Sequence, residues 1–385
     1  MQRRRQSAVV AGVIAAVVFA VLAVALPWHG HSKRKGTGTD PLAGVTLREQ
    51  AATRDIAIGV GANSQRLLDP RYQQLIGSNF NSITDTNAFK WDVTEPRPGE
   101  FNFTAADRVV SVAERYHLRV RGHTLIWHNQ NPSWLTQGHW TKAALKAVMK
   151  RHIMSVVGRY RGLVAQWDVV NEALTTAKPS GRYVLRSDLW EKVIGPEYVA
   201  DAFIWAHEAD PSAQLFYNDY GAEAPSRRFD AEYRMVARLK AAGVPINGVG
   251  LQMHRPVPKA PPYYPTKAQV STVLRQFADI GVHTEITEMD QPLPLPPQPA
   301  QLGLQASLFE QMTAACLSVQ LCGGVTIWGA DDSDRYPVLI KRDLGAATLF
   351  TTSGQPKLAY RGVLAALIKA PGPLAQARGE PQTVP

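Results

Sequence analysis

Two glutamates stand at the ends of short β-branched runs in this chain of 385 residues. Glu172 closes the segment Trp-Asp-Val-Val-Asn-Glu at 167–172, and Glu288 lies in His-Thr-Glu-Ile-Thr-Glu-Met-Asp at 283–290. Cleaving a bond between two sugars needs one carboxyl group as proton donor and a second as base or nucleophile on the other side of the bond. A lone glutamate of this kind would be read as a solvated loop acid. Two such strand ends can supply the catalytic pair.

The elements that must position these glutamates repeat along the chain from about residue 51. Each unit is a short β-rich run, then polar residues, then a helical pattern. The predicted strands are 56–61, 80–85, 119–127, 164–170, 214–218, 248–252, 282–287 and 324–328. The predicted helices between them include 103–116, 142–160, 197–208, 231–242 and 267–280. Eight such units predict an α/β fold, a single-domain (β/α)8 TIM barrel.

Polar and aromatic residues follow nearly every predicted strand. In strand order they are Asn87 and Lys90, His123 with Trp127 and His128, Asn171 and Glu172, Asn218 and Tyr220, Gln252 and His254, Glu288 and Asp290, and Trp328. Polar residues that were scattered along the chain would not fall so regularly after the predicted strands. Since chemistry in such barrels sits at the carboxyl ends of the strands, all are expected at one mouth. The fourth and seventh strands, with the two glutamates, are expected on opposite sides of it.

The composition limits the other classes of function. With 45% hydrophobic and 19% charged residues, the chain is globular and can bury a large core. The formal charge is +10, but six of the cations lie before the first acid, Asp40. The body is therefore only mildly basic and its cations are scattered, which argues against a nucleic-acid partner. No Cys or His cluster has metal-ligand spacing. We expect neither metal nor organic cofactor, because two protein carboxyls can do the chemistry.

The first residues resemble a targeting segment. Arg3, Arg4 and Arg5 precede an apolar run at about 8–26, and Ala-Val-Ala at 23–25 has the form that a signal peptidase accepts. The segment 1–27 is predicted to be a signal peptide or an N-terminal membrane anchor, and both alternatives export the rest. The predicted order continues with a linker at 28–46, the catalytic domain at 47–370 and a disordered tail at 371–385.

The only two cysteines, Cys316 and Cys322, lie six positions apart. We expect a disulfide between them that closes the turn between a helix and the next strand, in agreement with export. The alternative is a pair of buried thiols in a reducing compartment.

Five blocks of the sequence resemble the family-10 glycoside hydrolases, the endo-β-1,4-xylanases. They are Asn-Ala-Phe-Lys-Trp at 87–91, Arg-Gly-His-Thr-Leu-Ile-Trp-His at 121–128, Trp-Asp-Val-Val-Asn-Glu at 167–172, Thr-Glu-Ile-Thr-Glu-Met-Asp at 284–290 and Val-Thr-Ile-Trp-Gly at 325–329. The similarity extends from about Leu47 to Leu367. Each block alone is moderately specific, whereas all five in this order are strongly so.

The resemblance implies a role for each residue of the catalytic group. Glu172 resembles the general acid/base and Glu288 the nucleophile of a retaining enzyme, which implies carboxyls ~5–5.5 Å apart and a covalent glycosyl intermediate. His254 would bridge Glu288 and Asp290 by hydrogen bonds and so fix the nucleophile. Asn171 would hold the hydroxyl beside the reacting carbon, where contacts strengthen in the transition state.

The resemblance also implies a set of sugar contacts. Hydroxyls on the glycone side would be bound by Asn87, Lys90, His123 and Gln130. Trp127 and Trp328 would stack on pyranose rings. Contacts with sugar or with the two glutamates are expected from Asn218, Tyr220 and Gln252. For Trp91 and Trp167 we expect plain core packing.

The sequence departs from the family pattern on the glycone side. Family members usually carry acids beside the asparagine that corresponds to Asn87, whereas this chain has Thr86 and Ala88. A second tryptophan after Trp328 is replaced by Tyr336. Both changes touch the glycone subsites, so they bear on the strength of glycone binding and on the preferred sugar.

These observations predict an exported, monomeric, retaining endo-β-1,4-xylanase that acts on xylan or xylo-oligosaccharides. One alternative is a related β-glycosidase or transglycosidase on another β-linked glycan. A second alternative is a non-catalytic carbohydrate-binding barrel. Glu172 and Glu288 beside Asn171 and His254 argue against the second alternative, because a binding protein has no use for the whole group.

Overall fold

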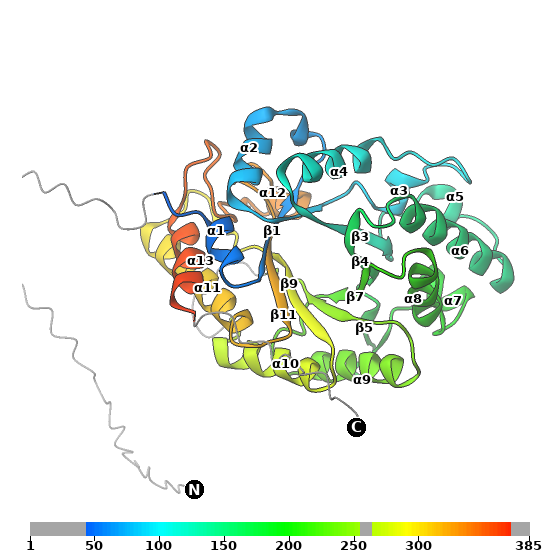
Figure 1. Cartoon of the computed structure of the whole chain (residues 1–385). Helices are drawn as coiled ribbons and strands as arrows, with labels where there is room; N and C mark the ends of the chain where they lie inside the picture. The colour runs from blue at the N-terminus through cyan, green and yellow to red at the C-terminus, as the bar shows by residue number, and fades with distance from the viewer. Residues whose placement is uncertain (1–43, 255–263, 371–385) are drawn as a thin grey trace, which may run out of the picture. The chain divides into compact units, whose positions relative to one another are not determined.

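The computed structural model describes residues 44–254 and 264–370 (Figure 1). Within these residues eight parallel strands close into a barrel in the order β1-β11-β9-β8-β7-β4-β3-β2. They are β1 (Ala57–Ala62), β2 (Ser82–Asp85), β3 (Arg119–Ile126), β4 (Val164–Asn171), β7 (Gln214–Asp219), β8 (Gly248–Leu251), β9 (His283–Met289) and β11 (Cys322–Ile327). The predicted (β/α)8 barrel is confirmed, and each predicted strand overlaps an observed one.

Helices surround the barrel (Figure 1). They are α1 (Leu47–Ala52), α2 (Pro70–Asn79), α3 (Trp91–Thr94), α4 (Thr104–Tyr116), α5 (Ser133–Thr136), α6 (Lys142–Arg159), α7 (Leu189–Val193), α8 (Tyr198–Ala209), α9 (Arg227–Ala241), α10 (Lys267–Asp279), α11 (Pro299–Cys316), α12 (Pro337–Lys341) and α13 (Leu358–Lys369), with the 3₁₀ turn η1 at Arg66–Leu68. Two small antiparallel pairs join β5 (Leu174–Ala177) to β6 (Arg182–Leu185) and β10 (Leu293–Pro294) to β12 (Leu344–Gly345).

Capping side chains explain several helix starts. Thr141 accepts a hydrogen bond from the Ala144 N–H at the start of α6, and Thr266 forms a capping box with Gln269 at the start of α10. Ser226 caps α9 through the Phe229 N–H, so this helix begins at Arg227, four residues before the predicted start at 231. Both tryptophans that were assigned to the core, Trp91 and Trp167, are buried.

A layer of buried charge crosses the barrel interior. Arg121 on β3 forms a close ion pair with Asp168 on β4, and its Nη1 lies 3.0 Å from Glu285 Oε2 on β9. The Gln166 amide on β4 donates to the other Glu285 oxygen at 2.5 Å. Burial would raise the pKa of Asp168, but the charge of Arg121 outweighs it and holds this pKa below its ordinary value. Three strands are thereby tied together inside the barrel.

The two cysteines form a disulfide that joins the end of α11 to the start of β11. Replacing both by alanine should lower the melting temperature with little change in catalytic rate, because the pair does not line the cavity described below. In the chain-entropy model the loss for so short a loop is about 2–3 kcal/mol at most. Mass spectrometry of the non-reduced protein from an oxidising compartment tests the pairing. Two free thiols there would contradict it.

One buried carboxyl on α9 predicts a dependence of stability on pH. Glu232 is fully buried, and within residues 44–254 and 264–370 neither of its carboxyl oxygens has a hydrogen-bond partner. Burial first, and then the charge of Asp219, raise the pKa of Glu232 well above its ordinary value. The folded state therefore binds this proton more tightly, so stability falls as pH rises from the unfolded pKa of about 4.3 towards the folded pKa.

Glu232→Gln should remove that loss. We expect a melting temperature several degrees higher than the parent at pH 7 and nearly equal to it at pH 4, where both states hold the proton. Thermal unfolding at the two pH values measures the effect. The same shift at both would mean that the charge of Glu232 is not its cause.

The predicted leader at 1–27 and tail at 371–385 lie outside the described residues, as does most of the predicted linker. Among the helices of residues 44–254 and 264–370, none is long and apolar enough to cross a membrane.

Candidate active site

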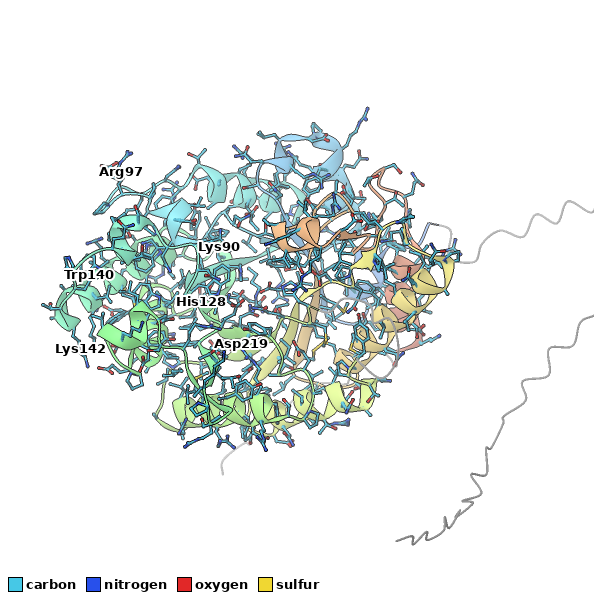
Figure 2. All side chains as sticks on the ribbon, turned by 180° about the vertical axis from the view of Figure 1, so that it is seen from behind. Lys90, Arg97, His128, Trp140, Lys142 and Asp219 are labelled. Carbon is cyan, nitrogen blue, oxygen red and sulfur yellow. A yellow bond between two sulfur atoms is a disulfide. The ribbon has the colours of Figure 1, made fainter. Side chains whose placement is uncertain are left out.

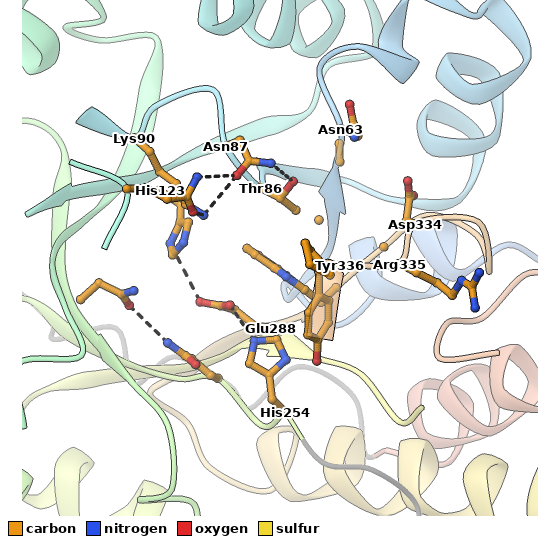
Figure 3. A pocket seen from close by; sticks show the side chains of 18 of the residues that line it. Asn63, Thr86, Asn87, Lys90, His123, His254, Glu288, Asp334, Arg335 and Tyr336 are labelled. Atoms are coloured by element: carbon orange, nitrogen blue, oxygen red, sulfur yellow. Dashed lines mark hydrogen bonds and ion pairs between the residues drawn. The ribbon is translucent and has the colours of Figure 1, made fainter. Parts of the chain in front are cut away.

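Glu288, near the carboxyl end of β9, is a carboxylate held on both oxygens. Asn218 Nδ2 donates to Oε1 at 2.7 Å. His254 Nε2 lies 2.9 Å from Oε2 (Figure 3). Burial alone would raise the pKa of Glu288. The attraction of His123 and the hydrogen bond from His254 outweigh burial and hold this pKa below its ordinary value. Glu288 is therefore ionised and fixed in orientation.

His254 stands between Glu288 and a second acid. Its Nδ1 lies 3.1 Å from Asp290 Oδ2. Burial opposes protonation of this ring, but the charge of Asp290 and the contacts with both carboxylates raise the pKa of His254 well above its ordinary value. A protonated imidazole donates from both nitrogens, so it can hold both carboxylates at once.

Glu172 follows the last residue of β4. Its backbone is left-handed, with φ of 55°, and its N–H donates to the Asn218 carbonyl oxygen at 2.9 Å. Gln252 Nε2 donates to Glu172 Oε1 at 3.0 Å. His128 Nδ1 lies 3.8 Å from the other oxygen, Oε2. Burial, and then the charge of Arg186, lower the pKa of His128, so the Glu172 carboxyl has a neutral neighbour there.

Figure 2 shows the side chains of the described residues from behind. Lys90, His128 and Asp219 lie well inside the view, whereas Arg97, Trp140 and Lys142 lie towards its edge.

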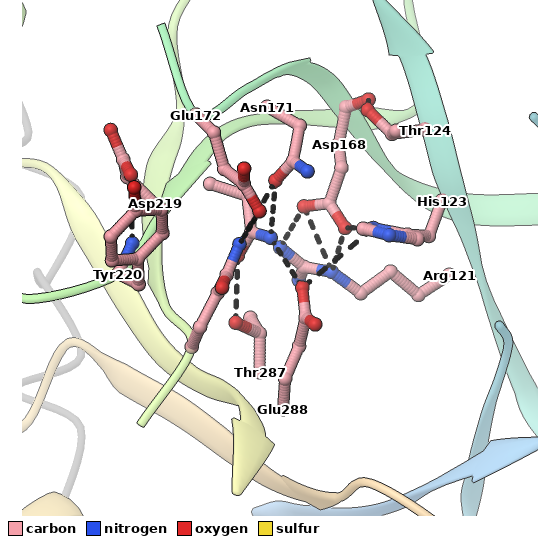
Figure 4. Close-up of polar contacts among 12 residues, drawn as sticks. Arg121, His123, Thr124, Asp168, Asn171, Glu172, Asp219, Tyr220, Thr287 and Glu288 are labelled. Carbon is pink, nitrogen blue, oxygen red and sulfur yellow. Dashed lines mark hydrogen bonds and ion pairs between the residues drawn. The ribbon is translucent and has the colours of Figure 1, made fainter. Parts of the chain in front are cut away.

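The strands of the two glutamates, β4 and β9, stand three places apart in the ring of eight strands. Around the closed ring, β7 and β8 stand between β4 and β9. Two amide side chains from this part of the ring connect the glutamates. Asn218 Nδ2, on β7, donates to Glu288 and to Asn171 Oδ1 (2.8 Å), and Gln252 Nε2, directly after β8, donates to Glu172 and to Asn171 Oδ1 (3.3 Å). Glu172, Asn171 and Glu288 are labelled in Figure 4. A continuous amide chain thus joins the two carboxyls.

A second polar group lies on the β2 and β3 side of the mouth. Lys90 Nζ donates to Gln130 Oε1 at 2.6 Å and to Asn87 Oδ1 at 3.3 Å, and Gln130 Nε2 donates to Asn87 Oδ1 at 3.1 Å. The Lys90 ammonium also lies 4.7 Å from the centre of the Trp127 ring. Burial lowers the pKa of Lys90, against the charge of Glu288. These polar groups beside an aromatic face can bind sugar hydroxyls.

These side chains surround a cavity of about 510 Å³. The predicted residues that line it are Asn87, Lys90, His123, Trp127, Gln130, Asn171, Glu172, Gln252, His254, Glu288, Trp328 and Tyr336. One cavity therefore collects residues from widely separated parts of the chain. Among residues 44–254 and 264–370, no cluster of His, Cys, Asp and Glu is placed to hold a metal ion.

Five residues singled out from the sequence do not line this cavity, and one of them is His128, which lies beside Glu172. Asn218 and Asp290 are fully buried. Asn218 contacts Glu288 directly, whereas Asp290 contacts His254, which in turn contacts Glu288. Tyr220 is 40% exposed, and the Arg228 guanidinium lies 4.2 Å from its ring centre. Ala88 is buried, whereas its neighbour Thr86 does line the cavity.

One wall of the cavity was missed by the sequence reasoning. Arg66 pairs with Asp331 and Asp334 at 2.7 Å each, and the Tyr72 hydroxyl donates to Asp334 at 2.7 Å. Arg66, Asp334, Asn63 and Arg335 line the cavity. Arg66 follows β1, and the acids follow β11, which is the neighbour of β1 in the barrel. The sequence does carry a signal for this wall. Opposite charges follow the first and the last strand, and these two strands are neighbours in a closed barrel.

The arrangement places two carboxyl groups with different hydrogen-bond partners at one cavity. Glu288 is ionised and held by donors on both oxygens, whereas Glu172 receives a single amide hydrogen bond on one oxygen. A fixed carboxylate beside a second carboxyl of this kind suits nucleophilic attack with proton donation to a leaving group.

Comparisons with known proteins agree with this chemistry. Residues 46–366 match the model of glycosyl hydrolase family 10. The chain is 38% identical over 316 residues to a β-1,4-xylanase of Dictyoglomus thermophilum. The aligned residues make up 78% of this chain and 86% of the relative. It is 37% identical over 320 residues to endo-1,4-β-xylanase B of Thermotoga neapolitana, with coverage of 82% and 90%.

Solved structures are similar as well. Xylanase 10B from Thermotoga petrophila RKU-1, in complex with xylobiose, matches with a TM-score of 0.79 at 35% identity and covers 88% of this chain and 99% of its own. Native xylanase 10B from Thermotoga maritima matches with a TM-score of 0.78 at 37% identity, with coverage of 84% and 98%.

Proposed function

Because the chain belongs to glycosyl hydrolase family 10, we propose that it is a retaining endo-β-1,4-xylanase. The single observation that carries the proposal is the Glu288 carboxylate, held by Asn218 and His254 and joined by amide side chains to Glu172. The relatives above are named as xylanases, and one solved neighbour holds xylobiose.

The proposed reaction has two steps. A Glu288 oxygen attacks the anomeric carbon and forms a glycosyl ester, while Glu172 gives its proton to the oxygen of the departing sugar. A water molecule then attacks the same carbon, Glu172 takes up a proton from that water, and Glu288 leaves as a carboxylate. Two inversions give a product with the original β configuration.

The remaining residues have proposed supporting roles. Asn171 holds the hydroxyl next to the anomeric carbon, and His254 with Asp290 keeps Glu288 charged and oriented. On the glycone side Asn87, Lys90, His123 and Gln130 bind hydroxyls. Trp127, Trp328 and Tyr336 offer ring faces to the sugars.

Incubation of the purified protein with xylan, and in parallel with mixed-linkage β-glucan, tests the activity. We expect release of reducing xylo-oligosaccharides from xylan, with the β anomer appearing first in proton NMR. Preferential cleavage of the glucan would favour the related β-glycosidase. No release from either polymer would favour a carbohydrate-binding barrel, and an initial α anomer would overturn retention.

We also propose that the protein is exported through its N-terminal apolar segment and acts as a monomer on extracellular polymer. Size-exclusion chromatography with light scattering tests the second statement.

The glycone side predicts a preference for longer substrates. Tyr336 lies 5.7 Å from the His254 ring, centre to centre, where family members usually place a tryptophan. A tyrosine covers less of a sugar, so binding there should be weak. Tyr336→Trp should raise kcat/KM for short xylo-oligosaccharides roughly 3–10-fold, if about 1 kcal/mol of stacking is recovered, and change xylan hydrolysis less.

The control is Tyr336→Phe, which keeps a ring of similar size and removes the hydroxyl near the charge of Asp290. Comparing the two variants separates ring stacking from an effect on His254 and Asp290. An unchanged or lower kcat/KM for Tyr336→Trp on the short substrates would show that this position does not stack on the sugar.

A further inference from the structure

The turn that carries Glu172 is held by contacts from outside its own strand. Glu172 has a left-handed backbone, with φ of 55°. This conformation is unfavourable for residues other than glycine, so the turn must be stabilised by its surroundings. The orientation of the Glu172 carboxyl therefore depends on the groups that form hydrogen bonds with the backbone of residues 172–174.

Three hydrogen bonds grip the first two residues of this turn. The Glu172 N–H donates to the Asn218 carbonyl oxygen at 2.9 Å. Arg186 Nε donates to the Glu172 carbonyl oxygen at 3.2 Å. The Ala173 N–H donates to the Tyr217 hydroxyl oxygen at 3.1 Å. In the last contact a side chain holds the residue that directly follows Glu172.

Asp219 fixes the direction of the Tyr217 contact. The Tyr217 hydroxyl donates its single hydrogen to Asp219 Oδ2, so its oxygen is left to accept from Ala173. Asp219 Oδ1 accepts from Arg228 Nη2 at 2.6 Å, and the same nitrogen lies 3.3 Å from the Leu174 carbonyl oxygen. Through Tyr217 and Arg228, Asp219 thus reaches two successive residues after Glu172.

These groups stand behind the site and not in it. Tyr217 and Asp219 are fully buried, and neither lines the cavity. Packing alone explains the aromatic ring of Tyr217. It does not explain a buried hydroxyl joined to a buried carboxylate, because phenylalanine would fill nearly the same volume without polar groups to satisfy.

We propose that Tyr217 and Asp219 are positioning residues for the acid/base, acting through the backbone of residues 172–174. The inference rests on the proposed role of Glu172. Removing the Tyr217 hydroxyl leaves the Ala173 N–H without its acceptor and Asp219 without one donor, so the turn loosens. The Glu172 carboxyl then spends less time where it can transfer a proton. Glu288, on β9, keeps its own contacts.

The loss of kcat/KM in such variants should therefore be larger for a substrate whose leaving group needs a proton. We compare kcat/KM for two aryl β-xylobiosides, one with phenol as a poor leaving group and one with 2,4-dinitrophenol, which leaves without protonation. Tyr217→Phe should lower kcat/KM for the phenyl substrate and for xylan roughly tenfold, the size of one hydrogen bond, and that for the dinitrophenyl substrate less than about twofold. Tyr160→Phe removes a similar tyrosine–carboxylate hydrogen bond, to Asp107, away from this turn, and should leave both values unchanged.

Equal loss on both substrates would mean general damage and would overturn the inference, as would no loss on either. Asp219→Asn tests the same contact if Tyr217→Phe does not fold, since an amide cannot accept from both Tyr217 and Arg228 as the carboxylate does. The same leaving-group dependence is expected.

Glu172→Ala separates this inference from the proposed function. If Glu172→Ala lacks leaving-group dependence, the acid/base assignment itself fails. If Glu172→Ala shows the dependence, then adding Tyr217→Phe to it should cause no further loss, because the tyrosine acts through the missing carboxyl. A further tenfold loss in the double variant would mean that Tyr217 acts elsewhere.

Discussion

Glu288→Ala should abolish turnover of xylan and of every aryl xyloside. The variant removes the oxygen that forms the covalent bond. Among the residues that the structure describes, the two that contact this carboxylate at hydrogen-bond distance, Asn218 and His254, are donors and cannot replace it. Loss of a nucleophile typically lowers kcat on the order of 10⁵-fold or more. Initial rates on xylan and on a dinitrophenyl xyloside measure it.

The matched control is Glu310→Ala, which removes a partly exposed glutamate of α11 that pairs with Lys369. It should retain full activity. Substantial xylan hydrolysis by the Glu288→Ala protein, at a melting temperature close to that of the parent, would overturn the assignment of the nucleophile.

Glu172→Ala should have an effect that depends on the leaving group. Hydrolysis of xylan should fall on the order of 10³-fold or more, because the departing sugar oxygen needs a proton. A dinitrophenyl substrate should still form the glycosyl intermediate with Glu288, which then accumulates because no base activates water. Added azide needs no base, so it should restore turnover and give a β-configured glycosyl azide.

The backbone of residue 172 suggests the control for this experiment. Alanine in a left-handed conformation costs about 1–2 kcal/mol relative to glycine. Glu172→Gly should therefore be more stable than Glu172→Ala, with the same response to azide. An α-configured azide product, or no rescue in either variant, would contradict a retaining mechanism in which Glu172 is the acid/base.

Much of the barrel could be predicted because its strands carry local signals. The β-branched runs that end in polar residues are short and buried, and the observed strands differ from the predicted ones by at most two residues at either end. Helix α2 was missed although Asp69 and Pro70 form a typical start. The β5–β6 hairpin was missed as well, because its half-exposed residues lack a strong apolar pattern.

The contacts of the site could not be predicted from local signals. Which residues stand at the mouth follows from their position after each strand. Which of them touch depends on the order and register of strands far apart in the chain. The hydrogen bond from Asn218 to Glu288 and the ion pairs of Arg66 with Asp331 and Asp334 are of this kind. The positive φ of Glu172 likewise has no sequence signal, since glutamate rarely adopts it.

The charged layer inside the barrel limits how this protein can be divided or recombined. The first four strands carry Arg121, Asp168 and Gln166, whereas Glu285 lies on β9 in the second half. A half-barrel made of the last four strands would bury the Glu285 carboxylate without either of its partners, and a buried unpaired charge is strongly destabilising. The two halves are therefore not interchangeable modules. Exchange of half-barrels with a relative will preserve folding only where the incoming half matches Arg121 or Glu285.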